Sequence, residues 1–249
     1  MNPLETIRES TPARLWMGRS GTSYRTSTSL QLRSDHAAAR DAVLAELDLE
    51  CDLGAGTVER FGLFEVQTCA RSKAEYLLRP DLGRSLSPSA LSLIDQRCPK
   101  GVDLQIVIGD GLSSLAVRAQ VPELLHSLDE LAFDQDWQFG QPFFVRYCRV
   151  GVLNDLGASL GANVIVLLIG ERPGLATAES LSAYLAFQPK SGHTDANRNL
   201  ISNIHSRGVP IHDAAKRIIA LAEQMRKRRS SGVEIKEDLT NYASLSPSS

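Results

Sequence analysis

The sequence predicts an α/β fold: a Rossmann-like body with a mainly parallel sheet and flanking helices, preceded by a smaller helical N-terminal part. Residues 104–108 and 164–169 are short, almost wholly apolar runs, which is typical of strands buried on both faces of a parallel sheet. Segments with helical periodicity accompany these runs, and helices are what cover such a sheet. The front part is polar at first and then rich in helix-forming residues.

The front part is expected to form an extended arm followed by a helix. Residues 19–29 are rich in Ser, Thr and Arg without a helical period, so we expect an extended, hydroxyl-rich loop there. A helix should follow over residues 34–47. Ser34 or Asp35 can cap its first free N–H groups, and its interior is rich in alanine.

The next segment is expected to hold a strand and a second helix. Gly54 breaks the helical pattern, and residues 61–68 are a candidate strand. Residues 79–90 should form a loop that leads into a helix. The pair Ser87-Pro88 fits the start of that helix, because proline is tolerated in a first turn.

From residue 102 onward, strands and helices are expected to alternate. Residues 104–108 form the first strand, followed by the turn Gly109-Asp110-Gly111 and a helix that begins near Ser113. Residues 142–147 and 164–169 are two further strands, and a helix over residues 210–229 ends in four basic residues. The expected parts are an extended N-terminal arm and helical part at 1–52, an α/β domain at 53–232, and a polar C-terminal tail at 233–249.

Composition excludes several classes of protein. A chain of 249 residues, 43% of them hydrophobic, can bury a large core without disulfides or a structural metal. Its formal net charge of -2 gives no reason to expect a nucleic-acid partner or an acidic membrane. No apolar run approaches the ~20 residues that span a bilayer. The four cysteines form no CxxC pair, so we expect free thiols in a reducing compartment and a soluble, cytoplasmic protein.

The sequence contains no self-contained catalytic set. The motifs GxxxxGK[ST], HExxH and GxSxG are absent, so we expect neither a catalytic residue nor a metal site in this chain. The turn Gly109-Asp110-Gly111 lies where a dinucleotide-binding turn would be, but Ser114 takes the place of the third glycine. Asp110 would also put a negative charge beside a pyrophosphate. An independent α/β enzyme that binds a nucleotide or another small molecule at this turn is the alternative hypothesis.

Polar residues follow the predicted strand ends, where ligands of open α/β sheets bind. Residues 170–174 (GERPG) come directly after the third buried strand. Glu171 would place two acceptor oxygens there, suited to amide or hydroxyl donors; its alternative role is a surface ion pair with Arg172. Residues 147–151 form a second such strand end, and residues 199–208 are a third dense polar patch.

Seven segments, in order along nearly the whole chain, carry a family resemblance. They are TPARLWMGRSG (11–21), SDHAAARDAV (34–43), YLLRPDLGR (76–84), IVIGDGLSS (106–114), PFFVRYCRVGVLNDLG (142–157), VLLIGERPGLATAESLSAYLAFQP (166–189) and LISNIHSRG (200–208). Together they resemble the small (light) subunit of ethanolamine ammonia-lyase, an adenosylcobalamin-dependent enzyme that converts ethanolamine to acetaldehyde and ammonia. One segment is more than twenty residues long, so the resemblance is more specific than any short motif.

The resemblance implies a partner. In this family the large subunit is a TIM barrel that holds the substrate and carries out the radical chemistry, while the small subunit closes over the corrin at the interface. The implied assembly is a higher-order hetero-oligomer, and this chain is not expected to be active alone. A subunit without its own catalytic residues fits that arrangement, because a cofactor can supply the difficult chemistry.

The resemblance also implies corrin-contacting residues in the α/β domain. The valine of the RYxRV string is Val150 here, and the glutamate of GERPG is Glu171. A third family position is commonly a cysteine before ISNIH. It is Leu200 in this chain, which keeps an apolar contact and removes any thiol-specific role.

Two further expectations follow from departures within the family. The chain lacks the DxHxxG string by which some cobalamin proteins supply a histidine ligand, so base-on adenosylcobalamin, shared with the large subunit, is expected. Some relatives carry a longer N-terminal extension that directs them into a bacterial microcompartment. Only ten residues precede Thr11 here, so a cytoplasmic location is expected, with microcompartment association only through the large subunit.

Overall fold

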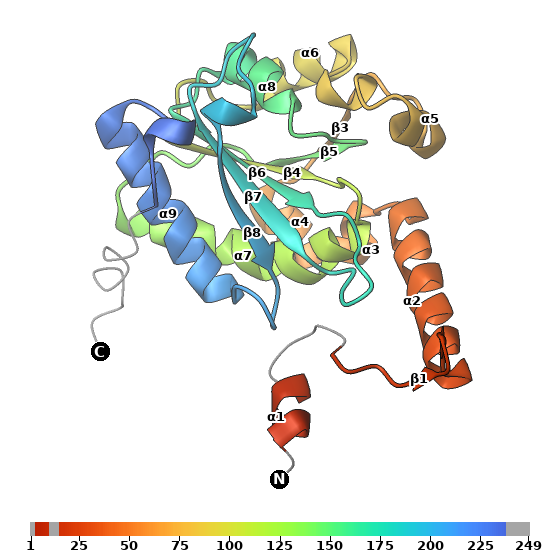
Figure 1. Ribbon diagram of the computed structural model, residues 1–249. Coiled ribbons are helices and arrows are strands. Elements are labelled where there is room, and N and C mark those ends of the chain that lie inside the picture. The colour runs from red at the N-terminus through yellow and green to blue at the C-terminus, as the bar shows by residue number, and fades with distance from the viewer. Residues whose placement is uncertain (1–2, 10–14, 238–249) are drawn as a thin grey trace.

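The computed structural model describes residues 3–9 and 15–237 and has an open sheet at its centre (Figure 1). Its strands follow the order β3-β5-β4-β6-β7-β8. The pairs β3–β5, β5–β4 and β4–β6 are parallel, whereas β7 is antiparallel to both of its neighbours. The strands are β3 (Glu65–Gln67), β4 (Leu104–Gly109), β5 (Phe143–Arg146), β6 (Val164–Gly170), β7 (Leu181–Phe187) and β8 (Asn199–Ile204). The predicted α/β class with a mainly parallel sheet is confirmed.

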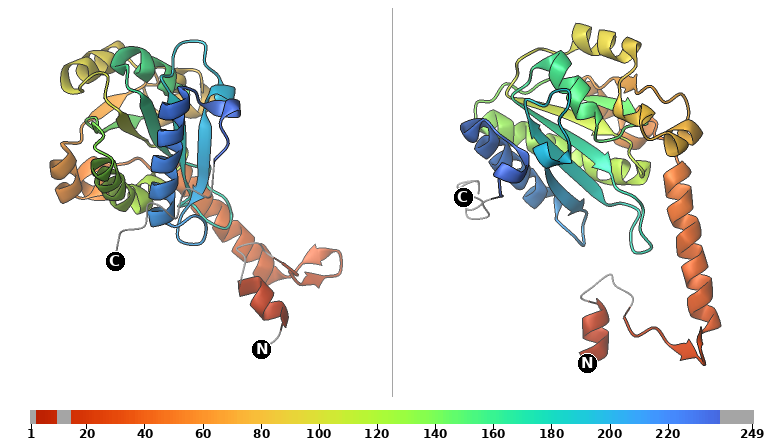
Figure 2. Two further views of the ribbon diagram at one scale, coloured as in Figure 1. Left: turned by 90° about the vertical axis from the view of Figure 1, so that its left-hand side faces the viewer. Right: turned by 45° about the horizontal axis from the view of Figure 1, so that its top comes forward.

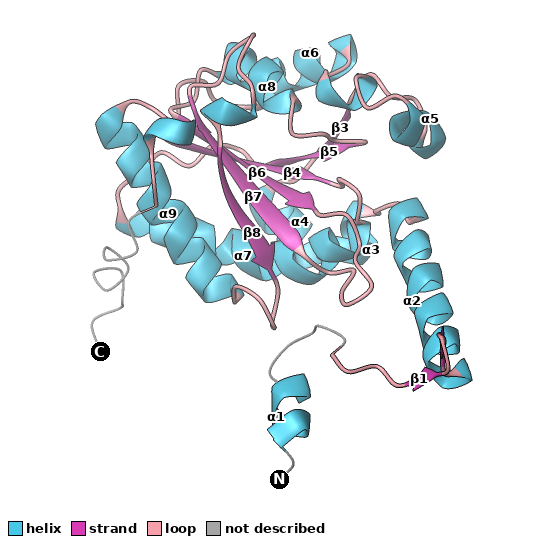
Figure 3. Cartoon of the chain, in the orientation of Figure 1, coloured by secondary structure: helices cyan, strands magenta, loops and turns pink. Residues whose placement is uncertain are grey.

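Helices cover both faces of this sheet (Figure 3). The apolar side chains of α3, α4, α7 and α9 join one core cluster with one face, and those of α6 and α8 join a second cluster with the other. Every residue of β4 and β6 is therefore buried, which explains why their sequences are apolar without alternation. The helices are α3 (Leu49–Leu53), α4 (Ala55–Phe61), α5 (Lys73–Leu78), α6 (Pro88–Arg97), α7 (Ser114–Asp134), α8 (Val152–Leu160) and α9 (Ile211–Arg228).

The chain connections diverge next to β4. Helix α7 leads from β4 to β5 on one side, and α8 then leads from β5 to β6 on the other side of β4. The two helices lie on opposite faces of the sheet, as their separate core clusters require. Such a topological switch point leaves a crevice beyond the carboxyl ends of the strands, and this crevice is where a ligand is expected.

The N-terminal arm projects from the body (Figure 2). It consists of α1 (Pro3–Glu9), a hairpin of β1 (Arg19–Ser20) and β2 (Ser23–Tyr24), and α2 (Thr26–Leu44). The extended conformation predicted for residues 19–29 is therefore found only in the hairpin at residues 19–24, whereas residues 26–29 are helical. Serine and threonine are tolerated in the first turns of a helix, and here α2 begins at Thr26, well before the predicted caps. Within α2 only Ala42 is buried.

Other predicted boundaries also need correction. Gly54 breaks the helical pattern as predicted, because it ends α3 at a positive φ of 83°, but a further helix, α4, begins at the next residue. The strand predicted for residues 61–68 is only β3, since Phe61 still belongs to α4. Helix α5 and strands β7 and β8 were not predicted. The domain boundaries 52/53 and 232/233 stay predictions, and residues 238–249 of the predicted tail lie outside the described residues, as do residues 10–14 of the arm.

No helix in the described ranges is long and apolar enough to cross a membrane. Nor do the residues described here bring three histidine, cysteine, aspartate or glutamate side chains together as a metal site would.

Candidate functional site

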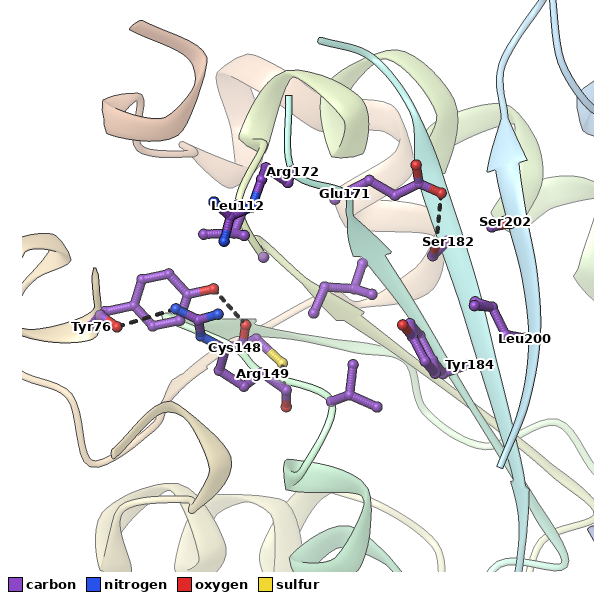
Figure 4. A pocket seen from close by; sticks show the side chains of 14 residues that line it. Tyr76, Leu112, Cys148, Arg149, Glu171, Arg172, Ser182, Tyr184, Leu200 and Ser202 are labelled. Atoms are coloured by element: carbon purple, nitrogen blue, oxygen red, sulfur yellow. Dashed lines mark hydrogen bonds between the residues drawn. The ribbon is translucent and has the colours of Figure 1, made fainter. Parts of the chain in front are cut away.

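A cavity of about 390 Å³ lies at the topological switch point (Figure 4). We call it the inner cavity. Its walls come from the segments that follow β4, β5 and β6, from α5, and from β7 and β8. Val150, Glu171 and Leu200, which the sequence places far apart, all line it. The structure thus brings the three candidate residues to one site.

Glu171 is held by three donors of its own chain. Its Oε1 accepts hydrogen bonds from Ser182 Oγ at 2.7 Å and from the Asn203 backbone N–H at 2.8 Å. Its Oε2 accepts one from Ser180 Oγ at 2.7 Å. The carboxylate therefore ties the end of β6 to the start of β7 and the end of β8. A carboxylate has about four acceptor positions, so one position at Oε2 is left for a ligand donor.

Val150 and Leu200 both supply apolar surface to the inner cavity. Val150 is half-buried in the turn between β5 and α8, beside Arg149, whose backbone N–H donates to the Gly83 carbonyl at 2.8 Å. Leu200 lies on the edge strand β8, opposite Tyr184 of β7, and is 47% exposed. A large apolar side chain that stays exposed at the rim of a cavity favours cover by a ligand or a partner.

Tyr76 and Arg149 form a wall that the sequence did not reveal. The Tyr76 hydroxyl donates to the Cys148 carbonyl at 3.0 Å, and the Arg149 guanidinium lies 4.4 Å from the centre of the Tyr76 ring. Arg149 Nη2 also donates to the Tyr76 carbonyl at 3.4 Å. Burial raises the pKa of the Tyr76 hydroxyl, so this group stays a hydrogen-bond donor across the physiological range.

Asp110 does not line the inner cavity. Its carboxylate is buried and accepts the backbone N–H groups of Tyr147 at 3.0 Å and Cys148 at 2.8 Å. Burial raises the pKa of Asp110, and the Lys73 ammonium group, 3.7 Å away, opposes this effect. Asp110 therefore fixes the end of β4 to the end of β5, beneath the inner cavity.

The space for a nucleotide at the start of α7 is filled by backbone. Gly111 has a φ of +58°, and a side chain there would collide with the carbonyl oxygen of Gly170. The Leu112 N–H donates to that same oxygen at 3.1 Å, and Ser113 Oγ caps the first turn of α7. A pyrophosphate on this helix end would need the room that the end of β6 occupies. This packing argues against the alternative hypothesis of a nucleotide-binding turn.

An outer cavity of about 600 Å³ continues the inner one. Arg149, Val150 and Tyr184 line both cavities, so the two form one crevice along the ends of the strands. The glutamate lies at the inner end. Arg198 and His193 line the outer end.

The fold and crevice define an α/β protein with a cavity of ligand size at a topological switch point. The sequence model described as "Ethanolamine ammonia-lyase light chain (EutC)" matches residues 1–236, and the chain belongs to this family. Relatives include proteins named ethanolamine ammonia-lyase small subunit from Clostridium perfringens, 41% identical over 92% of this chain and 76% of that protein. The one from Clostridium acetobutylicum is 39% identical over 94% of both chains, and the one from Clostridioides difficile is 42% identical over 92% and 76%.

These comparisons confirm the family that the seven sequence segments indicated. The family is that of a lyase complex, and the name small subunit implies a large-subunit partner.

Proposed function

We propose that this chain is the small subunit of an adenosylcobalamin-dependent ethanolamine ammonia-lyase and that it closes over the corrin at the interface with a large subunit. The observation that carries the proposal is the convergence of Val150, Glu171 and Leu200 on one crevice at the switch point. Family membership and relatives at about 40% identity support the reaction class, ethanolamine to acetaldehyde and ammonia.

The crevice fits a flat, apolar ring system with amide side chains at its edge. The acceptor position left on Glu171 suits a carboxamide N–H, and Val150 and Leu200 offer apolar contacts to the ring. When bound, adenosylcobalamin would supply the radical chemistry of the reaction. This chain's residues would bind and orient the ring and exclude water from one side of it. We expect no residue of this chain to handle the substrate.

The proposal includes the assembly. We expect a TIM-barrel large subunit, a higher-order hetero-oligomer, and a cofactor that keeps its own base on cobalt. Electron paramagnetic resonance of the cob(II)alamin state tests the last point, because coupling to a protein imidazole nitrogen would contradict it. We expect the complex to work in the cytoplasm, and association with a microcompartment would come through the large subunit.

Reconstitution tests the function. The chain, the large subunit and the co-expressed pair are assayed for acetaldehyde formation from ethanolamine, with and without adenosylcobalamin. We expect activity only from the pair and only with the cofactor. Turnover by this chain alone, or a pair that binds without any corrinoid-dependent turnover, would contradict the proposal.

A further inference from the structure

The outer cavity contains an unusual concentration of unsatisfied hydrogen-bonding groups. Among the residues that the structure describes, four buried side-chain polar atoms have no partner, and three of them belong to residues that line this cavity. They are Arg149 Nε, His193 Nδ1 and Arg198 Nε. Leaving a buried donor without a partner is unfavourable, so two guanidinium N–H groups and a histidine ring nitrogen around one cavity indicate an absent group that accepts hydrogen bonds.

Arg198 is built into this wall rather than placed on a solvated surface. Its side chain is only 6% exposed, although it carries a full charge. Its Nη2 donates to Asn154 Oδ1 at 3.1 Å, and Asn154 Nδ2 donates in turn to the His193 carbonyl at 2.9 Å. Asn154 thus holds the arginine and the histidine segment in a fixed relation at the start of α8.

The charge of the lining favours an anion. The lining contains three guanidinium groups and two carboxylates, which belong to Arg84, Arg149 and Arg198 and to Asp155 and Asp195. Asp155 Oδ2 accepts the Leu86 N–H at 2.9 Å, so it is engaged elsewhere. Asp195 pairs with Arg198 Nη1 at 2.7 Å, but its side chain is 88% exposed and can turn away into solvent. An entering anion can replace it at the guanidinium group, because arginine binds phosphate and carboxylate with the same fork geometry.

We propose that the outer cavity is a subsite for a phosphodiester, held by Arg198, Arg149 and His193. The inference rests on the proposed function and deepens it: a cobalamin carries amide groups around its ring and one phosphodiester in its nucleotide loop. The two ends of the crevice match these two chemistries, with the Glu171 acceptor at the inner end and the arginine and histidine donors at the outer end. The ring nitrogen of His193 serves as a third donor in its Nδ1–H tautomer.

The test compares two corrinoids that differ in this group. The purified complex with the large subunit is titrated with cyanocobalamin and with dicyanocobinamide, which lacks the nucleotide loop, and binding is followed by visible absorbance. Arg198→Gln should weaken cyanocobalamin binding about tenfold and dicyanocobinamide binding less than about twofold. The comparison within one variant cancels general effects on the site.

Controls separate the site from folding. If Arg198→Gln does not fold, His193→Ala should show the same selective loss. The ring nitrogen Nδ1 of His193 has no hydrogen-bond partner, whereas Arg198 bonds to Asp195 and Asn154. Arg118→Gln removes an arginine that is 60% exposed and pairs with Asp52, so it should change neither titration. Inorganic phosphate should compete with cyanocobalamin in the wild-type complex and not with dicyanocobinamide, with chloride at equal ionic strength as the reference.

The outcomes distinguish the two proposals. Equal loss of both corrinoids in the folded variants, or no loss of either, would overturn the phosphodiester subsite and leave the proposed function standing. Phosphate that stabilises the complex against heat without competing with cyanocobalamin would assign the cavity to a free anion and overturn the link to the cofactor. A wild-type complex that binds neither corrinoid would overturn the proposed function and the subsite together.

Discussion

Replacing Glu171 should reveal a residue that stabilises the fold and also contributes to the ligand site. Glu171→Ala removes the acceptor of three hydrogen bonds at the junction of β6, β7 and β8. Water can satisfy the Asn203 N–H, because that residue is exposed, whereas the Ser180 and Ser182 side chains are buried. Hydrogen bonds to a charged group contribute about 1.5–3 kcal/mol each, so two buried losses with partial relaxation amount to about 3 kcal/mol.

Glu171→Gln offers a matched comparison because it keeps the shape of the side chain. Its oxygen can still accept from the Asn203 N–H and from Ser182, and its NH₂ can donate to Ser180 after that hydroxyl turns. We expect a loss of only about 1 kcal/mol of stability. The carboxamide of a corrin, however, would lose a charged acceptor, and we expect corrinoid affinity of the complex to fall about tenfold.

Thermal unfolding followed by circular dichroism separates the two effects. For a chain of this size, 1 kcal/mol corresponds to roughly 2–4 °C, so Glu171→Ala should lower the Tm by roughly 6–12 °C and Glu171→Gln by roughly 2–4 °C. A visible-absorbance titration of the complex with cyanocobalamin measures the loss of affinity. A Tm of Glu171→Ala equal to that of the wild type would refute the structural role. Unchanged corrinoid affinity in Glu171→Gln would refute the ligand role.

Three other predictions follow from buried and titrating groups. Lys73→Met leaves the buried Asp110 carboxylate without its cation, so the free energy of unfolding measured in urea should fall by about 3 kcal/mol. The double variant Lys73→Met with Asp110→Asn should recover part of this loss. With a thiol reagent at about pH 8, the exposed Cys51 should react first, although its hydrogen bond with Asp48 raises the pKa of the thiol. Cys148 should react only after denaturation, because it is buried and burial raises its pKa well above the ordinary value. Cys51→Ser should abolish the first phase, and early labelling of Cys148 would contradict this order. Burial, followed by the charges of Lys190 and Arg198, lowers the pKa of His193 below its ordinary 6.5. The unfolded chain then binds more protons there than the folded chain, so stability should fall as the pH drops below about 6.5, and less so in His193→Gln; equal pH dependence of both Tm values would contradict the shift.

The central strands were predictable because their signal is local. The run 164–169 is apolar at every position and 104–108 at every position but Gln105, since helices cover both faces of the sheet. The caps at Ser87 and Ser113 follow from short side-chain oxygens next to helical sequence. In contrast, β7 contains leucine and alanine, which are good helix formers, and its pairing with β6 and β8 makes it a strand. Strand β8 lies at the edge, where three of its six residues are exposed, so no apolar run marks it.

The candidate site was predictable only in part, for a related reason. The strand-end rule placed Glu171 and Val150 at a ligand site, and the family resemblance added Leu200. Tyr76 was not found, because it contacts Cys148 across 72 positions of sequence and neither residue has a local signal. His193 and Arg198 of the outer cavity were missed for the same reason, since they come to line one cavity with Arg149 only when the chain folds.

The contact between Gly111 and Gly170 determines which parts of the crevice can change during evolution or protein engineering. A side chain at Gly111 would strike the Gly170 carbonyl, and one at Gly170 would strike the Ser113 carbonyl, so the floor is made of backbone and admits no substitution that alters its depth. Adaptation to a larger or differently decorated ligand is therefore confined to the rim. Leu200, exposed on an edge strand, is the position where such tuning costs the fold least.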